Sequence, residues 1–289
     1  MDFADQLKYC EVVSESITRV RIMSSKSKAS AEPLPSFKQP PVDEVVCGLR
    51  FEPLRQLKLP YIGLLWEKFR NDYPTTQHAI PIASDSSLLV DEATGVPLPR
   101  VWFISAADNE LIQFQLDRFY YNWRQRGDDY PRYPSIIEKF EKAKNQLDAF
   151  TNEIQLGTIN PVEYELTYIN HVSIGQGWEN IDDLPRVIRD LTWQREKHHF
   201  LPNPANVAWQ VKFSLPDGKG SLNVKLNQTT RKVDNVRGLI LELTAKGLGE
   251  EKTPRAMRSW FDLAHEWIVR GFTDLTTEEI QETVWKRER

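Results

Sequence analysis

The chain has 289 residues, long enough for one large domain or two of ordinary size with a real hydrophobic core. A hydrophobic content of 40% and nine Trp exclude general disorder, while a net charge of −4 is too small to predict nucleic-acid binding from charge alone. Two cysteines, the lack of an apolar run of about 18 residues and an acidic N-terminus predict a soluble, cytoplasmic protein without a membrane span.

Residues 1–36 are expected to form an N-terminal extension and a flexible linker. Residues 24–41 are rich in Ser, Lys and Pro, a composition typical of such linkers. Two interpretations of the residues before the linker stay open. They are either an extension upstream of a natural start at Met23 or a small helix that docks on a partner.

Residues 37–157 are expected to form a first α+β half. Residues 42–51 predict a strand, because β-branched residues lie there between prolines, and a helix opened by Pro60 follows. Residues 74–99 lack periodicity and are expected to be a long loop. The segments RVWFIS and ELIQFQLDRFYYNW then predict a hairpin around AADN, and an amphipathic helix covers about 134–154.

Residues 158–289 repeat this order and are expected to form a second half. A strand and a short helix precede three alternating strands and a final helix, predicted over 162–174, 182–191, 207–215, 221–230, 238–246 and 254–272. The early helices of both halves share a Leu-Pro entry, at Leu59-Pro60 and Leu184-Pro185. The predicted fold is therefore α+β with two similar halves, each a curved antiparallel sheet packed on a long helix, derived from an internal duplication.

Polar side chains inside apolar strands are the first candidate site residues. Read as one alternating strand, ELIQFQLDRFYYNW places Arg118 and Asn122 on the core-facing row of Ile112. A charged Arg on such a row needs a partner or a water-filled cavity. Glu44, early in the first strand, is expected to pair with Arg118 or Arg50, and a structural ion pair is favoured over a general base.

The phrase YELTYINH supplies two further candidates. Alternation puts Asn170 in line with Tyr168, while His171 joins Glu163 and Glu165 on the other face. Beside these carboxylates His171 could have a raised pKa and act as an acid or base. The alternative, which is favoured, is a structural histidine on a half-exposed sheet face.

The final helix carries an adjacent pair, His265 and Glu266. A zinc-protease helix needs a second His four residues after the first, and Val269 stands there. A catalytic pair is disfavoured because neighbouring helical residues do not face each other. We expect His265 to cap the core by a hydrogen bond and Glu266 to be solvated. Phosphate-binding glycine loops, nucleophile elbows and metal-ligand spacings are lacking too, so no cofactor is expected.

Residues 205–246 contain seven basic residues against three acidic ones. Lys212, Lys225, Arg231 and Lys232 could form a weak basic face for an acidic partner. A solvated sheet face is the favoured interpretation, and nucleic-acid binding is not expected, because the row lacks exposed aromatics for base stacking.

Five phrases also carry a likeness to other proteins. They are PPVDEVVCGLRF, YIGLLWEKFRNDYP, IQFQLDRFYYNWR, YELTYINH and WFDLAHEWIVRGFTDLTT, which contain the motifs PPxxE, FxxNWR, LTYINH and HEWIxxxFxxLTT. In these phrases the chain resembles a sporadically distributed, uncharacterised prokaryotic protein family with a provisional label only. The resemblance covers about residues 39–278. It implies no activity or ligand, and a patchy distribution suggests an accessory or defence-associated role.

The favoured hypothesis of function is a non-enzymatic protein-binding or regulatory module, with a protein partner or a second copy of the chain. The C-terminal tail fits it, because Ile280, Val284 and Trp285 have helical spacing and could pack on the body or dock on a partner. The alternative is an enzyme of unknown reaction with a small-molecule site between the halves. Its site would be lined by Arg118, Asn122, Asn170, His171 and His265, so their convergence in one polar pocket favours the enzyme and their dispersal favours the binding module.

Overall fold

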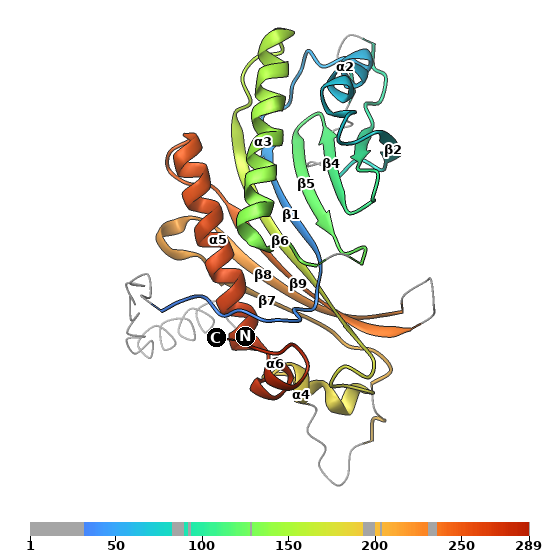
Figure 1. The fold of residues 1–289 in the computed structure, drawn as a ribbon, viewed down its shortest axis with the longest axis vertical. Coiled ribbons are helices and arrows are strands. Elements are labelled where there is room, and N and C mark those ends of the chain that lie inside the picture. Colours follow the sequence, from blue (N-terminus) through green and yellow to red (C-terminus); the bar gives the residue numbers. More distant parts are fainter. Residues whose placement is uncertain are drawn as a thin grey trace, which may run out of the picture. The chain divides into compact units, whose positions relative to one another are not determined.

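The computed structural model of the chain describes residues 32–82, 90–91, 94–127, 129–192, 200–202, 204–230 and 236–288. Leu34–Arg289 is one compact unit, distinct from Met1–Pro33. It is built on a nine-stranded antiparallel sheet with the strand order β2-β3-β4-β5-β1-β6-β9-β8-β7 (Figure 1). The predicted combination of helices with antiparallel strands is therefore confirmed. The expected helix or extension before Met23 lies outside the described residues.

Most strands and helices lie close to their predicted ranges. The strands are β1 (Val42–Phe51), β2 (Thr75–Ala79), β3 (Arg100–Ile104), β4 (Glu110–Gln115), β5 (Arg118–Arg124), β6 (Pro161–Ser173), β7 (Ala208–Ser214), β8 (Ser221–Thr230) and β9 (Arg237–Gly247). The helices are α2 (Leu59–Phe69), α3 (Arg132–Glu153), α4 (Leu184–Val187), α5 (Pro254–Leu275) and α6 (Glu278–Thr283).

The core lies between one face of the sheet and the two long helices. α3 contacts β1 and β5, and α5 contacts β6, β8 and β9 on the same face (Figure 1). Phe140 of α3 meets Phe261 of α5 with ring centroids 5.1 Å apart, and Tyr164 of β6 packs on Trp260 at 5.5 Å. Strand alternation explains this arrangement. It turns Val45, Cys47, Leu49 and Phe51 of β1 and Tyr164, Leu166, Tyr168 and Val172 of β6 into the core.

The predicted position of Arg118 and Asn122 is wrong. The segment read as one strand is two strands, β4 and β5, which are joined by a turn at 116–117. In their register Gln115 pairs with Arg118, and directly paired residues share a face. Arg118 and Asn122 therefore lie on the face away from the helices, while Phe114 lies in the core. The turn reverses the chain and shifts the alternation by one residue, which a period-two reading cannot detect.

The expectation of one long loop over residues 74–99 is wrong at its start. β2 pairs antiparallel with the whole of β3 and forms one edge of the sheet. Its five residues are mostly exposed, so the sequence has no hydrophobic alternation from which this strand could be predicted. Residues 83–89 and 92–93, within the same stretch, lie outside the described residues.

The N-terminal segment of residues 34–41, which we call the strap, pairs with the C-terminal tail. Phe37 and Arg287 form an antiparallel bridge. The Phe37 ring meets those of Phe272 and Trp285 edge-on, at 5.6 Å and 6.3 Å. Trp285 is only 2% exposed, so the tail packs on the body, one of the two alternatives left open by its sequence.

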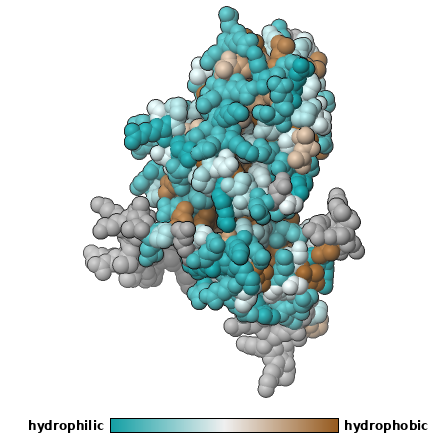
Figure 2. Space-filling view, in the orientation of Figure 1, coloured by the Kyte–Doolittle hydropathy of each residue, from teal (hydrophilic) through white to brown (hydrophobic). Residues whose placement is uncertain are grey.

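The visible surface is mixed. Hydrophilic residues predominate on the face seen in Figure 2, and hydrophobic residues form small scattered areas on it. Among the described residues, no helix combines the length and the apolar character needed to cross a lipid bilayer.

Candidate functional site

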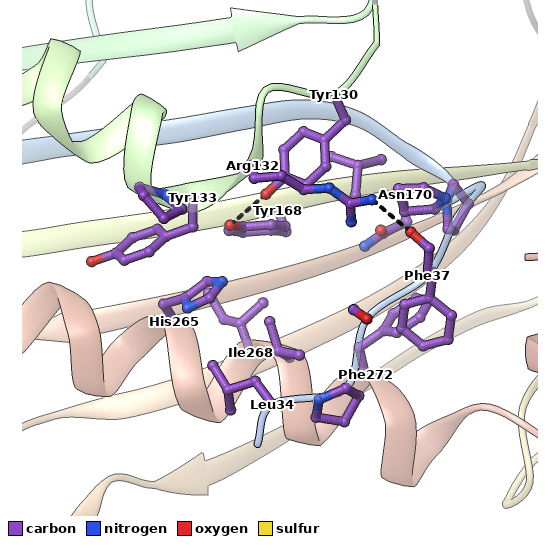
Figure 3. Close-up of a pocket in the computed structure, with 17 residues that line it drawn as sticks. Leu34, Phe37, Tyr130, Arg132, Tyr133, Tyr168, Asn170, His265, Ile268 and Phe272 are labelled. Atoms are coloured by element: carbon purple, nitrogen blue, oxygen red, sulfur yellow. Dashed lines mark hydrogen bonds between the residues drawn. The ribbon is translucent and has the colours of Figure 1, made fainter. Parts of the chain in front are cut away.

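A cavity of about 540 Å³ lies where α3, β6 and α5 meet the strap (Figure 3). We call it the strap cavity. Its walls come from the start of α3 and the residues before it, from β1 and β6, from α5 and from the strap. The lining residues are, in that order, Tyr130, Arg132, Tyr133 and Pro134; Val42, Tyr168 and Asn170; His265, Ile268, Val269 and Phe272; and Leu34, Pro35, Ser36, Phe37, Pro40 and Pro41.

The helical repeat explains the wall supplied by α5. His265, Ile268, Val269 and Phe272 stand at positions i, i+3, i+4 and i+7, which lie on one side of a helix. The strand repeat likewise brings Tyr168 and Asn170 to the same face of β6. The strap cavity is therefore lined by the C-terminal half of one side of α5, next to the start of α3.

Most of the polar side chains that line the strap cavity are aromatic. His265 stacks on Tyr133 with ring centroids 3.9 Å apart and an interplanar angle of 7°, and its ring lies 6.1 Å from that of Tyr168. The hydroxyls of Tyr130 and Tyr168 are hydrogen-bonded at 2.9 Å. The Tyr133 hydroxyl donates to Asp262 at 2.8 Å. These hydrogen bonds fix the positions of the three tyrosine rings.

Burial keeps these groups uncharged. It lowers the pKa of His265 from 6.5 to about 4, against the opposing effect of Asp262. Burial also raises the pKa values of Tyr133 and Tyr168, with Asp262 adding to the shift at Tyr133. Near neutral pH the imidazole is therefore a neutral aromatic ring and both phenols keep their protons.

Arg132 supplies a permanent positive charge at the edge of the strap cavity. Its guanidinium donates to the carbonyl of Phe37 at 3.0 Å and lies 5.7 Å from the centroid of the Tyr130 ring (Figure 3). Its backbone has a φ of 67°, a left-handed conformation that is uncommon for a residue with a Cβ. Such strained residues cluster at ligand clamps and active sites.

A second, polar cavity of about 920 Å³ adjoins the first. The two share five lining residues: Pro40, Pro41, Val42, Tyr130 and Arg132. Further walls of this polar cavity include Lys38, Asp43, Asp129 and His171, together with several glutamines. Two adjoining cavities, one apolar and one polar, suit a ligand with an apolar body and a polar end.

Of the residues predicted to line a site between the halves, Asn170 and His265 line the strap cavity. The Asn170 amide donates to the carbonyl of Leu241 at 3.0 Å, which fixes its orientation. The expected capping hydrogen bond of His265 is replaced by the stack on Tyr133. Glu266 is not simply solvated, because it forms an ion pair with Arg270 at 2.9 Å.

His171 lies on the face of β6 that was predicted for it and lines the polar cavity rather than the strap cavity. Its Nδ1 is 3.4 Å from the Ser173 hydroxyl. Its ring also packs on Gly238 of β9, where an added Cβ would lie 2.4 Å from Nε2. These contacts favour a structural role for His171.

Arg118 and Asn122 belong to polar networks on the opposite face of the sheet. Glu44 accepts a hydrogen bond from Asn122 and lies opposite Arg124, whereas Arg118 lies opposite Arg50 at the other end of β1. The predicted pairing of Glu44 with Arg118 or Arg50 is therefore wrong. Arg118 instead lies 3.6 Å from Asp117, and it donates to the hydroxyl of Tyr120 at 3.3 Å. Arg50 is beyond reach of Glu44 because the two residues are six positions apart on β1, roughly 20 Å along the strand.

The weak basic face is partly neutralised. Lys225 of β8 lies 3.9 Å from Glu242 of β9, and Lys212 stands on the exposed edge strand β7. Arg231 and Lys232 lie outside the described residues. The paired charge of Lys225 reduces the excess on which that prediction depended.

The sequence interpretation missed Tyr130, Arg132 and Tyr133. A usable signal was the segment YPRYP, in which two tyrosines and an arginine lie between prolines at a predicted helix start. Polar side chains placed between prolines, which restrict the backbone, are a pattern from which a binding site could have been predicted.

Comparison with known proteins adds no identification. No protein-family model matches the chain, and no curated protein matches it either. Within the described part of the chain, no cluster of three or more His, Cys, Asp or Glu side chains could hold a metal ion. The resemblance to a prokaryotic family stays a prediction.

The depressed pKa of His265 predicts an acid-sensitive fold. The unfolded chain takes up a proton on this residue near pH 6.5, and the folded chain does so only near pH 4. Stability is therefore intact above pH 6.5 and falls between these two values. Allowing for partial exposure, we expect a loss of about 2 kcal/mol by pH 4, measured by urea unfolding.

His265→Phe keeps the stack on Tyr133 without the titration, so its unfolding free energy should lack this part of the fall. His78→Phe, on the exposed edge strand β2, is the matched control and should behave as the wild type. An equal loss of unfolding free energy on acidification in the wild type and in His265→Phe would contradict the assignment of this loss to His265.

Proposed function

We propose that the chain is a non-enzymatic binding module with a regulatory role, and that the strap cavity takes the apolar body of a small ligand. The observation that carries the proposal is the face of α5 formed by His265, Ile268, Val269 and Phe272, which lines a cavity of about 540 Å³ together with Tyr168 and the strap. Volumes of about 300–1,000 Å³, with apolar walls and a few polar groups, are typical of small-molecule sites.

Binding is preferred to catalysis because the candidate catalytic side chains are dispersed. His171 lines a different cavity, and Arg118 lies on the opposite face of the sheet. A general acid or base needs a pKa near the working pH and reach to the substrate. His265 has the reach, but burial keeps it neutral and unable to donate a second proton near pH 7.

We also propose that the chain arose by an internal duplication and that it acts on a protein partner. The order β1-α2-β3-β4-β5-α3 is matched by β6-α4-β7-β8-β9-α5, and each set spreads outward from the central β1–β6 pair. This order supports an internal duplication, with β2 as an addition to the first half. In a regulatory role, a protein partner or a second copy of the chain would respond to the bound ligand, within an accessory or defence-associated system.

A dye titration tests the proposal. N-phenylnaphthylamine is neutral and apolar, and its fluorescence rises in apolar surroundings. We expect it to bind the chain and to bind Val269→Trp about tenfold more weakly, because an indole at this half-buried position fills the strap cavity.

Leu263→Trp is the matched control, since Leu263 is a half-buried residue of the same helix outside the cavity lining. It should bind the dye as the wild type does. Equal binding by both Trp variants, or no binding by the wild type, would contradict the proposal.

A further inference from the structure

The strap cavity contains a single permanent charge, and this charge selects among ligands. Among the described residues that line it, Arg132 and His265 are the ionisable bases, and carboxylates are missing. Burial lowers the pKa of His265 to about 4, so the imidazole stays neutral. Arg132 therefore sets the electrostatic preference of a cavity whose other walls are apolar or uncharged.

We propose, resting on the proposed function, that the ligand is a small aromatic carboxylate whose ring lies among Tyr133, Tyr168 and Ile268 and whose carboxylate meets Arg132. Aromatic cages can also bind organic cations through the faces of their rings. Here a guanidinium already lies 5.7 Å from the Tyr130 ring, so a second cation would be repelled. A carboxylate instead matches the planar fork of donors on Arg132.

A hydrogen bond and an uncommon backbone conformation hold Arg132 in its position. Its guanidinium is held by the Phe37 carbonyl at 3.0 Å, and its backbone adopts the left-handed conformation, with φ 67°. Figure 3 shows the side chain reaching along the cavity from the start of α3 to the strap, with His265 and Tyr133 at the other end. This geometry leaves the apolar wall for the ring and places the charge where the polar cavity begins.

The polar cavity limits the size and charge of the ligand. Asp43 and Asp129 line it together with Lys38 and Arg132, so its ionisable residues are of both signs. A second carboxylate extending into this cavity would meet Asp43 and Asp129 as well as Lys38, so no net attraction would offset the loss of its hydration. The structure therefore favours a monocarboxylate over a dicarboxylate.

Three probes with the same ring but different charge test the inference. They are naphthoate, naphthalenemethanol and naphthylmethylammonium, each titrated calorimetrically into the full chain. We expect naphthoate to bind about tenfold more tightly than the alcohol, and the ammonium more weakly than either. In Arg132→Gln the ratio of the carboxylate and alcohol dissociation constants should approach one, whereas Arg132→Lys should retain part of the preference.

Lys142→Gln removes a positive charge from the same helix outside both cavities and should keep the full preference. Equal affinities for the three probes in the wild type, or an unchanged preference in Arg132→Gln, would overturn the assignment of the carboxylate but leave the proposed function standing. If neither the probes nor N-phenylnaphthylamine bind, both are overturned.

Discussion

Arg118→Ala is expected to lower the free energy of unfolding by about 3 kcal/mol, because it removes one partner of a buried ionic group. Arg118 is 8% exposed and Asp117 is 2% exposed, with Nε and Oδ1 3.6 Å apart. The same guanidinium donates to Tyr120, whose hydroxyl in turn donates to Glu165 at 3.4 Å. Loss of the cation leaves buried polar groups without their charge partner.

Calorimetry should show this loss as a fall in Tm of roughly 6–12 °C for a unit of this size. Arg50→Ala is the matched control, since Arg50 lies opposite Arg118 in the β1–β5 register. Arg50 forms a half-exposed pair with Glu163 at 3.8 Å, and exposed pairs contribute less than about 1 kcal/mol. An unchanged Tm with lost biological activity in Arg118→Ala would refute a structural role and indicate a second site.

Phe37→Ala is expected to lower the free energy of unfolding by about 3 kcal/mol. The same substitution is expected to abolish ligand binding. Phe37 is 6% exposed, and its ring meets Phe272 and Trp285. Removing the ring leaves a void between the strap and the C-terminal tail. Because the strap is one wall of the strap cavity, binding of N-phenylnaphthylamine should fall with it.

Urea unfolding and the dye titration measure the two effects on the same protein. Phe213→Ala is the control, because Phe213 on edge strand β7 is 40% exposed and should change stability by less than about 1 kcal/mol. Lost stability with unchanged dye binding would show that the strap is not part of the site.

Local patterns carried most of the fold. β1 and β8 begin and end at the predicted residues, and α3 and α5 differ from prediction by at most a few residues, because long periodic stretches bounded by Pro or Thr are unambiguous. The turn at 116–117 was missed because Asp117 is its only turn-favouring residue and no Gly, Pro or Asn accompanies it. β2 was missed because an exposed edge strand needs no alternation.

The candidate site was harder to predict because it is made by tertiary contacts. Asn170 and His265 were singled out from the sequence, but their neighbours in the cavity come from the strap and from the entry to α3. The stack of His265 on Tyr133 joins residues 132 positions apart, and no local pattern encodes such a contact. Composition did not show that the charge of Arg132 would stand among aromatic walls.

Native mass spectrometry of the chain purified from its own cells tests the central claim most directly. We predict one non-covalent adduct with the mass of a small aromatic carboxylate, released unchanged on denaturation. Val269→Trp should lack this adduct and Leu263→Trp should retain it. Retention of the adduct by Val269→Trp, or a wild-type chain that is empty and binds no N-phenylnaphthylamine, would contradict the assignment of the strap cavity as a ligand site.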